Sequence, residues 1–138
     1  MITKILKKMF LLVTVSCFSF NLHAADWTMA SGYPKSNFHT QNIIKFIDDV
    51  KSTTSVNINL NPNDTLIKLD AIKTSLQRGQ IPIGEIRLGI YGNEDPMYIL
   101  AGLPFIAPDY SSAWLLKDVQ MEYLQEKFDK KGLMILYT

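Results

Sequence analysis

The sequence predicts an α/β domain with a mostly parallel sheet flanked by helices. Three observations support this fold class. Short apolar stretches of strand length alternate with longer stretches whose apolar residues recur at helical spacing, turn residues separate them, and the order strand, helix, strand, helix, strand repeats along the chain. Right-handed crossovers between such units build parallel sheets. Because the alternation continues to Thr138, we expect an incomplete first domain of a larger two-domain fold.

The first half of the chain predicts two strands with a helix between them. Residues 26–30 (DWTMA) predict a short strand, and a helix follows with Ser36 or Asn37 as its N-cap. Its apolar stripe consists of Ile43, Ile44, Phe46, Ile47 and Val50. Residues 56–61 then alternate apolar side chains with asparagines, which predicts a strand with one buried face, at an edge of the sheet.

The middle of the chain predicts a second helix and a third strand. Asp64 lies in a turn that supplies an N-cap, residues 66–76 have helical spacing, and Gly79 ends that helix. Residues 81–86 are largely apolar on both faces, as in a buried strand, and residues 91–96 predict a loop.

The last third of the chain predicts one more helix and a further strand. Residues 97–106 are apolar but interrupted by proline, so we expect a short helical turn and an extended segment that fills the core. Asp109 or Ser111 caps the next helix, which we expect in two pieces ending at Gly132. Residues 133–137 (LMILY) predict the start of a fourth strand.

The amino terminus has the pattern of a secretion signal. Three lysines precede the apolar run at residues 9–20, and small residues follow, which predicts a cleaved signal peptide at residues 1–24. A membrane span needs about 20 apolar residues, so no direct membrane insertion is expected after cleavage. An acylated Cys17 is the less favoured alternative. The predicted location is therefore the periplasm.

Removal of this signal changes the composition. The mature chain, residues 25–138, has no cysteine, and eleven basic residues face thirteen acidic ones, which gives a net charge of −2. Neither a disulfide framework nor a basic surface that binds nucleic acid is expected. The sequence lacks phosphate-binding and nucleophile-elbow motifs and paired metal ligands, so we expect no cofactor, no metal site and no catalytic residue.

Two places carry candidate ligand-binding side chains. The helix start at Asn37 and His39 presents free backbone N–H groups that attract carboxylates, although capping of the helix explains Asn37 equally. Glu85 and Arg87 lie two apart on the predicted third strand and would point the same way, either toward a ligand or into a local salt bridge. As an alternative, His39 is the single histidine of the mature chain and would serve a secreted hydrolase-like enzyme.

An ordered set of short motifs resembles one known family. The set comprises WTMASGYP (27–34), NFHTQN (37–42), LNPNDTL (60–66), GQIPIGE (79–85), NEDP (93–96), LPFIAPDY (103–110) and GLMILY (132–137). It resembles the amino-terminal part of the DctP-like substrate-binding subunits of tripartite ATP-independent periplasmic (TRAP) transporters.

The resemblance implies a periplasmic-binding-protein-like fold that closes on an organic acid, often a dicarboxylate, and delivers it to membrane permease subunits. It implies ligand contacts where the strands end, at positions that correspond here to Ala30, Ser31, Asn63, Asp64, Glu85 and Arg87. The carboxylate-clamping arginine of the family would lie beyond Thr138. A standalone periplasmic adaptor or sensor that pairs through an exposed sheet edge is a third reading.

Overall fold

The computed structural model describes residues 25–138, so the predicted signal peptide and Cys17 lie outside the described residues. Its centre is an all-parallel sheet in the order β2-β1-β3, formed by β1 (Asp26–Ala30), β2 (Asn57–Asn61) and β3 (Ile83–Gly84). β1 pairs along its whole length with β2, so that Ala30 lies opposite Asn61. The predicted α/β class and the edge position of β2 are confirmed.

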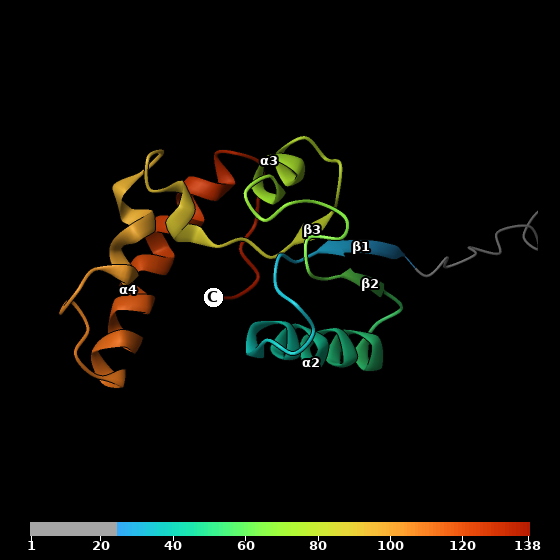
Figure 1. Ribbon diagram of the computed structural model, residues 1–138, viewed down its shortest axis with the longest axis horizontal. Helices are drawn as coiled ribbons and strands as arrows, with labels where there is room; N and C mark the ends of the chain where they lie inside the picture. Colours follow the sequence, from blue (N-terminus) through green and yellow to red (C-terminus); the bar gives the residue numbers. More distant parts are fainter. Residues whose placement is uncertain (1–24) are drawn as a thin grey trace, which may run out of the picture.

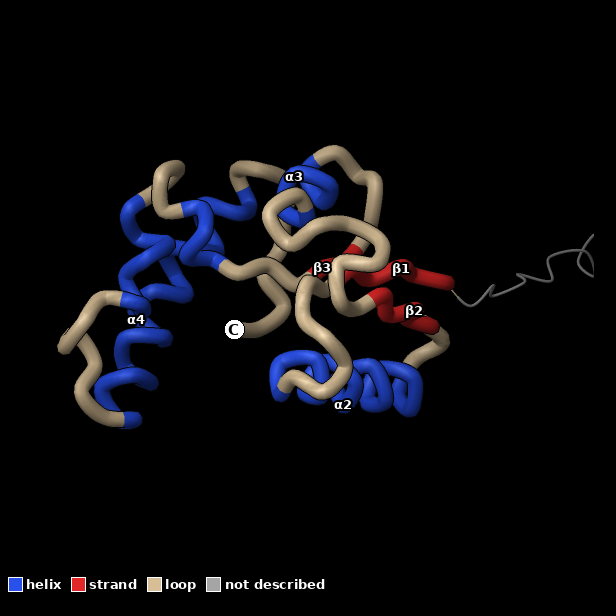
Figure 2. The backbone as a smooth tube through the Cα atoms, viewed as in Figure 1, coloured by secondary structure: helices blue, strands red, loops and turns tan. Residues whose placement is uncertain are grey.

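Helices cover both faces of this sheet, as Figures 1 and 2 show. α2 (Phe38–Thr53) packs on one face through a cluster of Met29, Ile43, Ile58 and Ile83. α3 (Ile72–Gln77) lies on the other side, where it forms a cluster of Ala30, Ile72 and Ile81. Burial of these apolar side chains is the main force that holds the helices against the strands.

A second layer of helices forms its own small core beside the sheet. Two 3₁₀ helices, η1 (Leu88–Tyr91) and η2 (Pro96–Gly102), pack against α4 (Tyr110–Asp129). The buried side chains of this core are Tyr91, Tyr98, Leu124 and Phe128. α4 is a single helix with Asp109 as its N-cap, so the expectation of two pieces was wrong. No helix within residues 25–138 is both long enough and apolar enough to span a membrane.

The third strand is shorter than predicted. β3 pairs with β1 only at Ile83 and Gly84, instead of along residues 81–86. β1 ends at Ala30, and the last bond of this ladder runs from the Glu85 N–H to the Ala30 carbonyl, 2.9 Å away. Beyond Glu85 no neighbouring strand within the described residues offers hydrogen-bond partners, so the strand stops there.

Three other expectations about elements were also wrong. Residues 133–138 follow α4 without forming a strand, because no ladder partner among the described residues pairs with them. The helix predicted over residues 66–76 begins only at Ile72, since bends and turns occupy residues 65–71. The segment expected to fill the core lies at the surface instead, with Phe105 96% exposed and at a positive φ of 63°.

Candidate functional site

The carboxyl ends of the three parallel strands meet at one edge of the sheet, which is where ligands bind in open α/β folds. Backbone bonds hold the segments that follow them side by side. The Ser31 N–H donates to the Asn61 carbonyl at 3.0 Å, and the Asp64 N–H donates to the Ser31 carbonyl at 3.2 Å. Glu85 joins the same edge through its bond to Ala30. The structure therefore brings together the positions after all three strands.

Ser31 and Glu85 form a side-chain pair at this edge. The Ser31 side chain is fully buried, and its hydroxyl donates to Oε2 of Glu85 at 2.5 Å. The same hydroxyl oxygen accepts from the N–H of Tyr33 at 3.3 Å. Ala30, by contrast, is fully buried within the core against α3, so its methyl group does not reach the edge.

The loop from Ser31 to Asn37 ties the start of α2 to the end of β2. The Tyr33 carbonyl accepts from the Asn63 N–H at 2.9 Å and from the Thr40 hydroxyl at 3.3 Å. Asn37 caps α2, since its side-chain oxygen accepts from the N–H of His39 at 2.9 Å. The exposed His39 ring stacks on Tyr33, with centroids 5.1 Å apart, and borders an open hollow of about 450 Å³. Both predicted residues of the helix start therefore lie near the edge.

Asn63 and Asp64 shape the turn after β2. Both have left-handed backbone angles, with φ of 59° and 57°, a conformation that asparagine and aspartate tolerate better than most residues. The Asp64 carboxylate accepts from the Leu69 N–H at 2.9 Å, which organises the bends before α3. Asn63 is exposed beside it. Asp64 thus acts on its own chain, and Asn63 presents its amide to solvent at the edge.

The predicted pairing of Glu85 with Arg87 on one strand was wrong. β3 ends at Gly84, and Arg87 is an exposed residue that directly precedes η1. No ion pair joins Glu85 to Arg87 within the described chain. Arg87 instead borders an open hollow of about 620 Å³ between the two 3₁₀ helices, which Leu88, Ile99 and Leu103 also line. The short β3 explains this, because the chain turns away once its ladder partner ends.

Tyr137 is a neighbour of this edge that the sequence did not reveal. Its ring packs on Phe46 of α2, with centroids 5.3 Å apart. Burial, together with the nearby negative charge of Glu85, raises the pKa of its phenol above the ordinary value. The sequence predicted Tyr137 only as an apolar residue of a strand at residues 133–137. Nothing local indicated that the segment returns toward Glu85.

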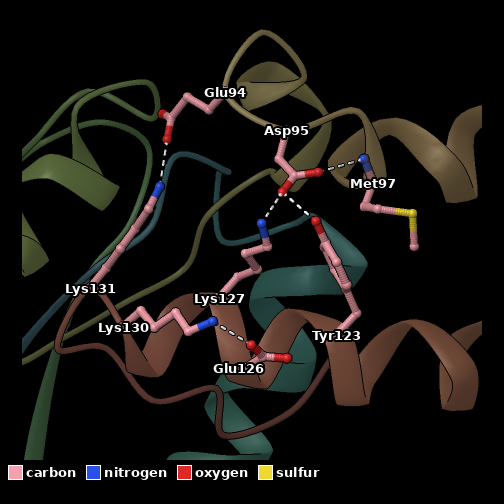
Figure 3. A network of polar contacts seen from close by, with 8 residues as sticks. All are labelled: Glu94, Asp95, Met97, Tyr123, Glu126, Lys127, Lys130 and Lys131. Carbon is pink, nitrogen blue, oxygen red and sulfur yellow. Dashed lines mark hydrogen bonds and ion pairs between the residues drawn. The ribbon is translucent and has the colours of Figure 1, made fainter.

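A second polar cluster lies away from the edge, at Glu94 and Asp95 (Figure 3). Glu94 forms ion pairs with the buried Lys73 of α3 and with Lys131, 2.9 Å away just after α4. The Lys73 ammonium also lies 4.1 Å from the centroid of the Tyr91 ring. The lysine partners lower the pKa of Glu94 through hydrogen bonds and charge. The sequence placed Glu94 only within a predicted loop, at residues 91–96, and did not reveal these long-range partners.

Asp95 completes this cluster from the other side. Its carboxylate accepts from the Tyr123 hydroxyl at 2.7 Å and from the Met97 N–H at 3.0 Å, and it forms an ion pair with Lys127 at 3.3 Å. The bond from Tyr123 is the largest cause of its lowered pKa. The two carboxylates thus join α3, η2 and α4. We call this cluster the clasp; its residues are Lys73, Glu94, Asp95, Tyr123, Lys127 and Lys131. The carboxylate oxygens of Glu94 and Asp95 are bound by donors of the protein itself.

Comparison with known proteins places this fold in a family. No protein-family model and no curated protein matches the sequence. Among solved structures, DctP6 of Bordetella pertussis, an extracytoplasmic solute receptor binding pyroglutamic acid, aligns with a TM-score of 0.79 and 39% identity over 82% of this chain. DctP7 of the same organism, also a pyroglutamic acid receptor, aligns at 0.78 and 33% identity over 83% of this chain. A marine metagenome TRAP protein specific for pyroglutamate aligns at 0.79 and 30% identity over 84%.

The chain belongs to the TRAP solute-binding protein family. It spans 38% of the length of DctP6 and of DctP7, and 39% of the marine protein. A more distant TRAP protein from Sulfitobacter, solved with bound galacturonate, has the same fold with a TM-score of 0.65 at 18% identity. The resemblance that the sequence motifs indicated is therefore confirmed.

Proposed function

We propose that this chain is part of the extracytoplasmic solute-binding subunit of a TRAP transporter, and that it binds a small cyclic organic acid of the pyroglutamate class. Three family structures that share 30% to 39% identity with it are pyroglutamate receptors. The ligand would lie against the carboxyl edge of the sheet, beside Glu85, Asn63 and the start of α2. Membrane permease subunits would be its partners, and the periplasm its location.

The observation that carries this proposal is the Glu85 carboxylate at the edge. A carboxylate there accepts hydrogen bonds from a ligand but repels a second negative group. Pyroglutamate has a single carboxylate, and the ring nitrogen next to the carbon that carries it has a lactam N–H, which can donate to Glu85. A dicarboxylate would bring like charges together. We therefore favour the lactam acid over the dicarboxylate that the family resemblance first suggested.

The two other readings have less support. For a hydrolase, His39 would need a nucleophile and an acid beside it, but its ring contacts the aromatic residues Tyr33 and Phe38. For an adaptor, β2 would need a free edge that attracts another strand, yet its outward residues are asparagines and it is only five residues long. A binding protein that is not an enzyme fits the edge best.

Calorimetry tests the ligand class. The protein is purified as the full natural chain, meaning these residues together with any that its reading frame carries beyond Thr138, and is titrated with pyroglutamate, malonate and glucuronate. We expect pyroglutamate to bind at micromolar concentration or tighter, equivalent to about 8 kcal/mol, and the other two acids far more weakly. Glu122→Gln, an exposed change on α4, serves as the control and should leave binding unchanged. Absence of binding to all three acids would contradict the proposal.

Intact mass of the secreted protein tests the location. If residues 1–24 are a cleaved signal, the mature amino terminus recovered from the periplasm is Ala25. A protein that keeps Met1, or that carries a lipid on Cys17, would show that this processing is wrong.

A further inference from the structure

The Ser31 hydroxyl already has two hydrogen-bond partners within the protein. The side chain is fully buried, and its hydroxyl both donates to Glu85 and accepts from the Tyr33 N–H. A buried hydroxyl must have hydrogen-bond partners, since leaving it without them costs about 1–3 kcal/mol. Here the partners are supplied entirely by the protein. At the position that the family resemblance assigned to ligand contact, the side-chain hydroxyl therefore has Glu85 as its acceptor.

Glu85 is fixed at two points by these contacts. Its backbone N–H donates to the Ala30 carbonyl at 2.9 Å, and its Oε2 accepts from Ser31 at 2.5 Å. Its second oxygen, Oε1, has no hydrogen-bond donor among residues 25–138, and the side chain is half-buried. The carboxylate thus presents one oriented and unused acceptor at the edge of the sheet.

We propose that Ser31 is a positioning residue that holds the Glu85 carboxylate as a fixed acceptor, so that the receptor selects ring acids with an N–H group over isosteres without one. This inference rests on the proposed function and deepens it, because it names the atom that the ligand must present. A fixed carboxylate forms a short, charge-assisted bond with an N–H group. A ring oxygen in the same place turns its lone pairs toward Oε1 of Glu85, so neither oxygen has a hydrogen-bond donor.

The expected discrimination is large. Sites that are built to hydrogen-bond one group of a ligand reject analogues that lack it by large factors, because a buried polar group is left without a partner. Free rotation of the Glu85 side chain would reduce this effect, since the carboxylate could then turn toward water. Ser31 removes that freedom, so loss of its hydroxyl should reduce selectivity more than it reduces overall affinity.

Pyroglutamate and its γ-lactone analogue, 5-oxotetrahydrofuran-2-carboxylate, differ only in N–H against O at one ring position and therefore test the inference. Both are titrated into the full natural chain. We expect the wild type to bind the lactam about 100-fold more tightly than the lactone. Ser31→Ala and Glu85→Gln should each reduce this preference at least tenfold, with lactone affinity changing by no more than about threefold. Ser55→Ala, an exposed serine that precedes β2 at the opposite edge, is the matched control.

The outcomes separate the two proposals. If Ser31 is merely structural, Ser31→Ala weakens the lactam and the lactone equally, the preference stays at its wild-type value, and the inference is overturned while the proposed function stands. If the wild type binds the lactam and the lactone equally, the inference is also overturned and the proposed function still stands. If the wild type binds neither ligand, the proposed function fails and the inference fails with it. Should Ser31→Ala fold poorly, Ser31→Cys takes its place, because a thiol of similar size is only a weak hydrogen-bond donor to Glu85 and should reduce the preference in the same direction.

Discussion

Gly84 shows how a single residue sets the position of the candidate site. It is the last residue of β3, and the space where a side chain would begin is filled by α3. A Cβ atom at Gly84 would lie 2.6 Å from Cγ2 of Ile72, which is itself fully buried. The missing side chain therefore lets β3 approach α3 closely, and Glu85 follows directly at the edge.

Gly84→Ala tests this close approach. The added methyl group would push α3 away from the sheet, and overpacking of this kind costs about 1–3 kcal/mol of unfolding free energy. Gly89→Ala is the matched control, because no atom lies within 4 Å of its added Cβ, so its effect should stay within about 0.5 kcal/mol. Urea denaturation measures both. Equal effects of the two substitutions would show that the contact with Ile72 relaxes without cost.

At the scale of elements, the sequence predicted what depends on local pattern and missed what depends on distant partners. The strand at Asp26–Ala30, the helix capped by Asn37 and the asparagine-alternating strand were all found, because capping and periodicity are local signals. The length of β3, by contrast, depends on its distant ladder partner, because the strand stops where β1 ends at Ala30. The site shows the same division, since the helix start at Asn37 followed from capping, the positions after the strands came only from the family resemblance, and the bond from Ser31 to Glu85, 54 residues apart, was not predicted.

The clasp makes the packing of α3 and α4 sensitive to acid. The folded pKa of Glu94 lies below its ordinary value, so its ion pairs contribute stability that is present above that ordinary value and is lost as the pH falls through the folded pKa. Solvent screens these pairs because Glu94 is 36% exposed, but Glu94→Gln also leaves the buried Lys73 without its anionic partner, so we expect a cost of about 1–3 kcal/mol at pH 7. The difference from wild type should vanish at acid pH.

Urea denaturation from pH 7 down to about pH 3 measures this dependence. Glu126→Gln is the control, because Glu126 pairs with Lys130 on the same helix face but both side chains are largely exposed. Its curve should follow that of the wild type. A constant difference between wild type and Glu94→Gln at all pH values would show that the glutamate contributes through packing and not through charge.

The two halves of α4 differ in how well they are covered. Leu124 and Phe128 are buried in the core that α4 forms with the two 3₁₀ helices. Trp114, Leu115 and Val119, by contrast, are 62% to 67% exposed. Exposed apolar side chains of this number favour association between molecules. Further exposed apolar side chains precede them along the chain at Leu103, Phe105, Ile106 and Tyr110.

Substitution of this surface should change association without changing stability. Leu115→Gln together with Val119→Gln should shift residues 25–138 from associated species toward monomer in analytical ultracentrifugation, with the urea midpoint unchanged. Leu124→Ala should instead lower the unfolding free energy by about 2–4 kcal/mol, since it opens a cavity in the core. If the double variant associates as strongly as the wild type, the contact surface lies elsewhere.

At the scale of the whole molecule, residues 25–138 would present one wall of the proposed binding site. The acceptor at Glu85 lies at an open edge of the sheet, and the hollow that borders the start of α2 is open. The family structures are more than twice as long as this chain. Charged hydrogen bonds to a ligand strengthen when water is excluded from both sides, which an open edge does not achieve.

Residues 25–138 alone should therefore bind pyroglutamate only weakly. Without a second wall the ligand keeps much of its hydration, so we expect a dissociation constant no tighter than about 1 mM, equivalent to about 4 kcal/mol. Calorimetry on these residues, with full-length DctP6 as the positive control, measures the difference, and DctP6 should bind far more tightly. Chemical shifts of Ser31 and Glu85 upon addition of ligand would show whether the weak contact occurs at the predicted edge. Micromolar binding by residues 25–138 would overturn the argument, because it would mean that the single edge already excludes enough water to hold the ligand.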